Sequence, residues 1–168
     1  MKLIVPNNHG YLDDKYTKHA SDNNKLGKYP IVSFPIEFKD IPDDTKSLAW
    51  VLMDVDSIPV CGFAYIHWLG CNLSPKIGKI DENASQLSHD FIQGNNSTAG
   101  RFVNETNPII SQHYIGPTPP DKEHVYTLIG YALSDDLKLS SGYWLNEFLK
   151  VSKDLIIDKS ILNLKVKA

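Results

Sequence analysis

The stretch Ser47-Leu48-Ala49-Trp50-Val51-Leu52-Met53-Asp54-Val55-Asp56 decides the fold class of this chain. It is short, rich in β-forming side chains, and bounded by turn residues at 41–45 and 56–59. A run of this kind is typical of a strand that is buried on both of its faces. We therefore predict a central strand here, and the rest of the sequence is interpreted around it.

Two further apolar runs of the same kind, at residues 63–73 and 125–133, predict two more long strands. The connection at 56–59 is too short to hold a crossover helix, so the first two strands are expected to be antiparallel neighbours. Alternating patterns at 36–39 and 161–166 predict two shorter strands. Many strands with few helices favour a β-sandwich with short helices at its edges.

The remaining segments are less periodic. Prolines break the first 46 residues into short pieces, and residues 82–92 could form a short helix ended by Gly94. Residues 94–123 predict a long ordered loop, and loops of that length are usually functional. The best helix candidate is residues 141–153, with its apolar face given by the helical spacing of Trp144, Leu145, Phe148, Leu149 and Ser152.

Composition excludes several classes of protein. The chain has 168 residues, 42% apolar and 22% charged, with a net charge of -3. It is too apolar to be disordered, and it lacks the basic excess of a general nucleic-acid binder. We expect one domain spanning residues 1–168, no integral membrane segment and a cytoplasmic location, because no long apolar run and no signal-peptide core occur. The two cysteines, Cys61 and Cys71, are interpreted as buried small hydrophobic residues.

Asp54 and Asp56 are the first polar residues that do not fit their surroundings. They lie two apart, so in an extended chain both point to the side that carries Leu48, Trp50 and Leu52. A carboxylate that continues a buried stripe needs a partner, because burying it alone is very costly. The alternative is that the strand emerges into solvent at Asp54 or that the aspartates cap the following turn.

Three other polar residues interrupt apolar strands. His67 lies between Ile66 and Trp68, and it is either a hydrogen-bonded core residue or a functional one. If the two strands are neighbours, an aspartate could lie beside this imidazole and raise its pKa. The ring would then be a cationic donor, which suits the binding of an anion. His124 and Tyr126 are two apart at a strand start and follow a proline-rich loop that would form a rigid pocket rim.

Metal and cofactor chemistry is not indicated. The histidines and aspartates would suffice in number for a metal site, but they are scattered and show no His-Glu-x-x-His spacing. Neither a Gly-x-Ser-x-Gly element nor a glycine-rich phosphate loop is present. We expect no metal and no cofactor, and no serine triad.

Three segments in order resemble the phosphatidylethanolamine-binding protein family, also called the Raf-kinase-inhibitor-like family, and in particular its bacterial and archaeal branch. Residues 53–59 are similar to its Asp-Pro-Asp-Ala-Pro element, and Ile66-His67-Trp68 to its His-Trp strand. Residues 114–133 are similar to its Tyr-x-Gly-Pro-x-Pro-Pro…His-x-Tyr…Tyr-Ala-Leu block. The likeness spans roughly residues 1 to 166.

The resemblance implies an all-β fold, a sandwich of two antiparallel sheets with Greek-key connections. It also implies a small surface pocket for anions such as phosphate or a phospholipid headgroup. Carried over residue by residue, that pocket consists of Asp54, His67, Pro119, His124 and Tyr126, with Asp56 and Tyr114 beside it. The histidines and the tyrosine would donate hydrogen bonds, and Asp54 would orient and charge an imidazole.

The chain also departs from the family pattern. Val55 stands where the family has a proline, and Ser57-Ile58 replaces a lone alanine. These changes are expected to alter where the strand exits and hence the aim of Asp54 or Asp56. Residues 99–113 form a longer loop than usual, which could narrow the pocket or cover it.

The favoured function is therefore a binding protein for a small phosphorylated or carboxylated ligand, with a protein partner such as a kinase as a further option. One alternative is a small hydrolase that uses a His/Asp pair in the same pocket. The other is an interaction protein with a vestigial pocket. No nucleophile is identifiable, so we expect that the protein is not an enzyme.

Overall fold

A computed structural model describes residues 1–168 and shows a mostly-β protein, with 34% strand and 17% helix. The strands are β1 Lys2–Ile4, β2 Asn7–Asn8, β3 Tyr11–Leu12, β4 Lys25–Leu26, β5 Tyr29–Pro30, β6 Ile36–Lys39, β7 Ser47–Asp54, β8 Tyr65–Leu73, β9 Lys79–Ile80, β10 Ile92–Gln93, β11 His124–Leu133 and β12 Ile156–Val166. The α-helices are α1 Ile58–Cys61, α2 Ala84–Leu87, α3 Pro108–Ser111 and α4 Leu145–Ser152, and the 3-10 helices are η1 Asp14–Tyr16, η2 Asp22–Asn24 and η3 Ser97–Ala99.

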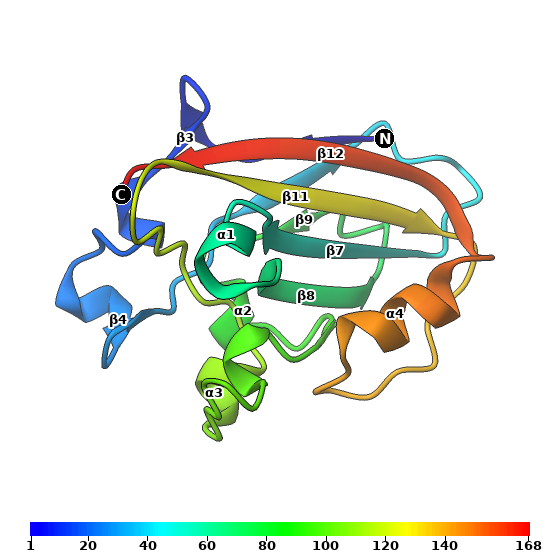
Figure 1. The fold of residues 1–168 in the computed structure, drawn as a ribbon. Helices are drawn as coiled ribbons and strands as arrows, with labels where there is room; N and C mark the ends of the chain where they lie inside the picture. Colours follow the sequence, from blue (N-terminus) through cyan, green and yellow to red (C-terminus); the bar gives the residue numbers. More distant parts are fainter.

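One large sheet forms the frame of the molecule. Its strand order is β10-β8-β7-β11-β12-β3-β2, and the four long strands lie side by side in Figure 1. All of its neighbours are antiparallel except β12 and β3, which pair in parallel. A three-stranded sheet, β1-β6-β9, and the β4-β5 hairpin complete the strands. The expected all-β class is confirmed as mostly β. The expected sandwich of two antiparallel sheets is wrong, because the large sheet is mixed where the chain enters β3 alongside the last strand.

Strand β7 is buried on both faces, as predicted. Leu48, Trp50 and Leu52 are fully buried in the larger apolar cluster, together with residues of β1 and β6. Ala49 and Val51 alternate with them and belong to a second cluster that contains Phe148 of α4. The large sheet therefore has the small sheet over one face and α4 over the other.

The pairing register brings the ends of three neighbouring strands together at one end of the large sheet. Strand β7 lies between β8 and β11, both antiparallel to it, which confirms the predicted pairing with β8. In this register Asp54 is opposite Tyr126 on β11 and opposite Tyr65 on β8. The end of β7 thus meets the beginnings of β8 and β11, and α1 follows directly at that end of β7 in Figure 1.

Several helix and strand limits differ from expectation. The helix predicted over 82–92 is only the four-residue α2, because the chain extends at Ser88 and continues into β10, which pairs with β8. The predicted loop 94–123 contains η3 and α3. The last strand begins five residues before the predicted Ile161, since β12 pairs with β11 along its whole length.

Two predictions of burial also need correction. Cys61 is exposed, because it ends α1, a helix with no buried residue, while Cys71 is buried as expected. On α4, Phe148 and Ser152 are buried, but Leu149 is 48% exposed, and Trp144, which precedes the helix as its N-cap, is 41% exposed. The helix is shorter than predicted, and fewer of its residues are buried than the helical spacing predicted. No helix of the structure is both long enough and apolar enough to cross a membrane.

The stripe on α4 can be tested with two neighbouring substitutions. Phe148→Ala is expected to lower the free energy of unfolding by about 3–5 kcal/mol, because it empties a fully buried site. Leu149→Ala, on the same helix but 48% exposed, is expected to cost far less. Urea denaturation measures both values, and equal losses would contradict the packing described here.

Candidate functional site

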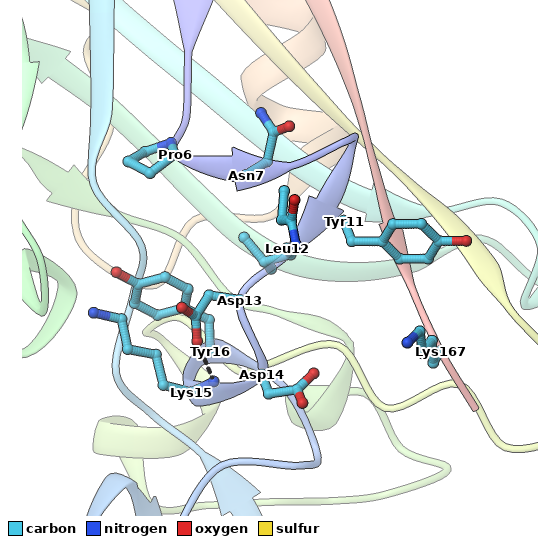
Figure 2. A pocket seen from close by; sticks show the side chains of 10 residues that line it. Pro6, Asn7, Tyr11, Leu12, Asp13, Asp14, Lys15, Tyr16 and Lys167 are labelled. Atoms are coloured by element: carbon cyan, nitrogen blue, oxygen red, sulfur yellow. Dashed lines mark hydrogen bonds between the residues drawn. The ribbon is translucent and has the colours of Figure 1, made fainter.

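The surface has several hollows, and one of them contains predicted site residues. Another, of about 570 Å³, is lined by residues of the N-terminal segment and by Lys167, as Figure 2 shows. Lys15 at its rim is paired with Glu82 at 2.5 Å, and the carboxylate of Asp13 accepts a hydrogen bond from the backbone N–H of Lys15. The charges of this hollow are therefore partly engaged in local structure.

The hollow with predicted site residues is a cavity of about 340 Å³ at the end of the large sheet where β7 ends and β8 and β11 begin. Four predicted residues line it, namely Asp54, His67, His124 and Tyr126. All four are at least 95% buried as residues. The remaining lining residues are Lys28, Tyr29, Ser57, Val60, Cys61, Tyr65, Val103, Ile115, Gly116, Thr118 and Pro120.

Asp54 is buried at the end of β7 and has partners for both carboxylate oxygens. Oδ1 accepts a hydrogen bond from the backbone N–H of Ser57 at 3.2 Å, and Oδ2 lies 2.7 Å from Nδ1 of His124. Of the alternatives left open by the sequence, the strand does not emerge into solvent here. The carboxylate both caps the turn and pairs with a buried imidazole.

His124, at the start of β11, is held between two carboxylates. Its Nδ1 faces Asp54, and its Nε2 lies 2.9 Å from Oδ1 of Asp121. Burial opposes the charge of the ring, but the hydrogen bonds to Asp54 and Asp121 outweigh it and raise the pKa of His124. Because a carboxylate can only accept, both ring nitrogens donate, and the imidazolium is the favoured form.

His67 has the opposite preference. Its Nδ1 lies 2.9 Å from the backbone oxygen of Ile115, so this nitrogen carries the proton. Burial lowers the pKa of His67 to about 4, more than the Ile115 hydrogen bond and the Asp54 charge raise it. The expectation of a charged His67 paired with an aspartate is therefore wrong, because His124 takes the carboxylate of Asp54. In the neutral ring Nε2 is an acceptor.

Aromatic rings enclose His67. Its ring centroid lies 5.2 Å from that of Tyr65 and 5.1 Å from that of Tyr126. Burial and the nearby Asp54 carboxylate raise the pKa of Tyr126, and burial raises that of Tyr65 to about 12. Both hydroxyls therefore stay protonated in the physiological range.

Three residues of the predicted site lie outside the lining. The Asp56 carboxylate accepts from the backbone N–H of Val125 at 2.8 Å, and so joins the β7 exit to β11. Tyr114 is buried in the core, with its hydroxyl donating to the backbone oxygen of Tyr16. Pro119 does not line the cavity, although its neighbour Pro120 does. These three residues support the walls, and a ligand-binding role for any of the seven stays a prediction.

Sequence reasoning missed several residues of the site. Asp121 directly follows the proline block, and its spacing of three residues before His124 was the one local signal for it. Lys28 and Tyr29 come from the loop-rich N-terminal segment, where nothing in the sequence marked them. Val103 comes from the long 99–113 loop, which therefore reaches the cavity.

The site does not have the arrangement of a metal centre. No group of three or more His, Cys, Asp or Glu side chains in the structure has a geometry that could hold a metal ion. We assign no metal ligands. The cavity offers two cationic donors, His124 and Lys28, together with a neutral acceptor and hydroxyl groups within a partly apolar wall.

The fold and the site define a class of mostly-β proteins with a small histidine-lined cavity at the end of the large sheet. Comparison with known sequences agrees with this class. Residues 4–167 match the family described as Phosphatidylethanolamine-binding protein, and the chain belongs to that family.

Sequence relatives support the assignment to the family, and solved structures support the fold. YxkA of Bacillus subtilis is 45% identical over 155 residues, which cover 92% of each chain. A UPF0098 protein of Chlamydia muridarum is 33% identical over 129 residues, covering 75% of this chain and 76% of that protein. A phosphatidylethanolamine-binding protein homologue from Chlamydia trachomatis superposes with a TM-score of 0.78 at 24% identity, covering 99% and 97% of the two chains. YbcL of E. coli, described as a new member of the mammalian PEBP family, gives 0.76 at 16% identity, covering 99% and 98%.

The neutral state of His67 has a consequence for acid stability. Its pKa of about 4 in the folded protein is below the ordinary 6.5, so in this window the unfolded chain binds a proton that the folded chain does not. This histidine therefore reduces stability as pH falls from about 6.5 to about 4, by at most about 3 kcal/mol. His67→Phe is expected to flatten that dependence in urea denaturation measured across the window. The exposed His89→Ala serves as control, and an unchanged slope for His67→Phe would contradict the neutral assignment.

Proposed function

We propose that this protein binds small phosphorylated or carboxylated anions in the cavity formed by Asp54, His67, His124 and Tyr126. The observation that carries the proposal is His124, a buried imidazole whose Nε2 already donates to a carboxylate beside the cavity. Charge-assisted donors of this kind are strong partners for phosphate and carboxylate oxygens. A buried cation on a cavity wall is a natural anchor for one of these anions.

The other polar groups narrow the ligand class. Neutral His67 offers an acceptor, so it suits a hydroxyl, a protonated phosphate oxygen or an ammonium group on the ligand. Tyr65 and Tyr126 offer hydroxyls that stay protonated, and Lys28 adds a positive charge at the wall. The volume of about 340 Å³ is at the small end of ligand sites, which favours a headgroup-sized molecule.

The hydrolase alternative is not favoured by this geometry. A general base needs a free lone pair, and both nitrogens of His124 are engaged as donors to carboxylates. The Nε2 of His67 has a lone pair, but burial lowers the pKa of this ring to about 4, which makes it a weak base. The Ser57 hydroxyl is committed to the backbone oxygens of Asp54 and Phe63, so it is a poor nucleophile. We therefore propose a binding protein without enzymatic activity. The protein partner and the cytoplasmic location stay predictions.

Calorimetric titration tests the binding proposal directly. Inorganic phosphate and phosphoethanolamine are titrated into the wild-type protein at about pH 6, where histidine at its ordinary pKa of about 6.5 is mostly protonated. His124→Gln is expected to weaken binding by about tenfold or more, because it removes the charged donor. His67→Ala is expected to weaken phosphoethanolamine binding, because the acceptor is lost.

The exposed His89→Ala is the matched control, since it removes a histidine that does not line the cavity. It should bind both anions like the wild type. Equal affinities for the wild type and both cavity variants would contradict the proposal that the anions bind in this cavity.

The raised pKa of His124 also predicts a pH dependence. A phosphate monoester is almost fully ionised above about pH 7, because its second pKa is about 6. Its affinity should therefore fall as pH rises from about 7 into the alkaline range, where His124 loses its proton. Titration with methyl phosphate across this range measures the effect, and His124→Gln should abolish the dependence. A flat wild-type profile would mean that His124 is not the anchor.

A further inference from the structure

Asp121 accepts the hydrogen bond from Nε2 of His124, which is the one donor of that ring that could be given to a ligand instead. The ring has two nitrogens, and Nδ1 is held by the buried Asp54, whose other oxygen is held by Ser57. That side of the ring cannot change partner without breaking the end of β7. The only exchangeable contact is the one from Nε2 to Asp121 at 2.9 Å.

Asp121 differs from Asp54 in its freedom to leave. Its side chain is 51% exposed, whereas that of Asp54 is 4% exposed. It lies in the connection between the proline block and β11, outside any helix or strand. Breaking a half-exposed contact costs little, because water can solvate the released carboxylate. The Asp121 side chain can therefore turn outward while the rest of the site stays intact.

We propose that Asp121 is an internal competitor, which stands on His124 where the oxyanion of a ligand binds and must be displaced by it. This inference rests on the proposed function, because it concerns the same anion site. The Asp121 carboxylate has the chemistry of the ligand class and is tethered three residues from His124, so its effective concentration is high. It lowers the apparent affinity of every anion that binds to His124.

The competition has a quantitative signature. A ligand that binds only when His124 is released has its affinity reduced by the fraction of released molecules, and this factor is the same for every such ligand. Removing the Asp121 carboxylate should then raise the affinities for acetate and for methyl phosphate by comparable factors. Simple charge repulsion would act differently, since its energy is proportional to the charge of the ligand. It would make the gain for the dianion about the square of the gain for the monoanion.

The test compares Asp121→Ala with Glu123→Ala by calorimetric titration of acetate and methyl phosphate at about pH 7, where the monoester carries close to two charges. Glu123→Ala removes an equal charge from the same connection, but the Glu123 carboxylate accepts from the exposed Tyr11 hydroxyl and does not contact His124. Asp121→Ala is expected to raise the affinity for both anions by roughly three- to tenfold, and Glu123→Ala is expected to leave both affinities nearly unchanged. Asp121→Asn, which keeps the shape of the side chain, is expected to give a smaller gain in the same direction.

Each other result overturns the inference. Unchanged or weaker binding in Asp121→Ala, with a wild type that binds, would show that Asp121 only supports His124, and the proposed function would stand. A gain for methyl phosphate near the square of the acetate gain, or equal gains in Glu123→Ala, would assign the effect to repulsion. If neither the wild type nor Asp121→Ala binds either anion, the proposed function fails and the competitor with it.

Discussion

The carboxylate of Asp54 joins the end of the central strand to both elements that build the cavity. It accepts from the turn that begins α1 and from His124 at the start of β11. A carboxylate buried at 3% exposure is tolerated only when it is paired and hydrogen-bonded. This requirement holds the exit of β7, the turn at Ser57 and the ring of His124 in one arrangement, so the cavity depends on it.

The two histidines of the cavity show how the partner of one nitrogen decides the charge of a ring. The Nδ1 of His67 faces a backbone oxygen, which is too weak a partner to offset burial, so the ring is neutral. The nitrogens of His124 face two carboxylates, which do offset burial. The same side chain therefore supplies an acceptor on one wall and a charged donor on the other.

The long strands could be predicted because their sequences contain a signal at their own length scale. The continuous apolar run of β7 and the alternation of β6 both reflect burial across a sheet. The four-residue helices α1 and α3 were not predicted, and α2 was predicted with limits that are too long, because one turn of helix shows no periodicity. The parallel pairing of β3 with β12 joins residues at opposite ends of the chain, and no local pattern reports it.

The sequence by itself determined the central strands, the mostly-β class, the family and four of the polar residues that line the cavity. Only the tertiary structure decided which aspartate meets which histidine, which histidine is charged, and that Asp56 and Tyr114 support the walls. It also added Asp121 and Lys28 to the site or its edge. The physical reason is that strand patterns depend on average burial along the chain. Protonation and recognition depend instead on contacts of about 3 Å between residues brought together from distant segments.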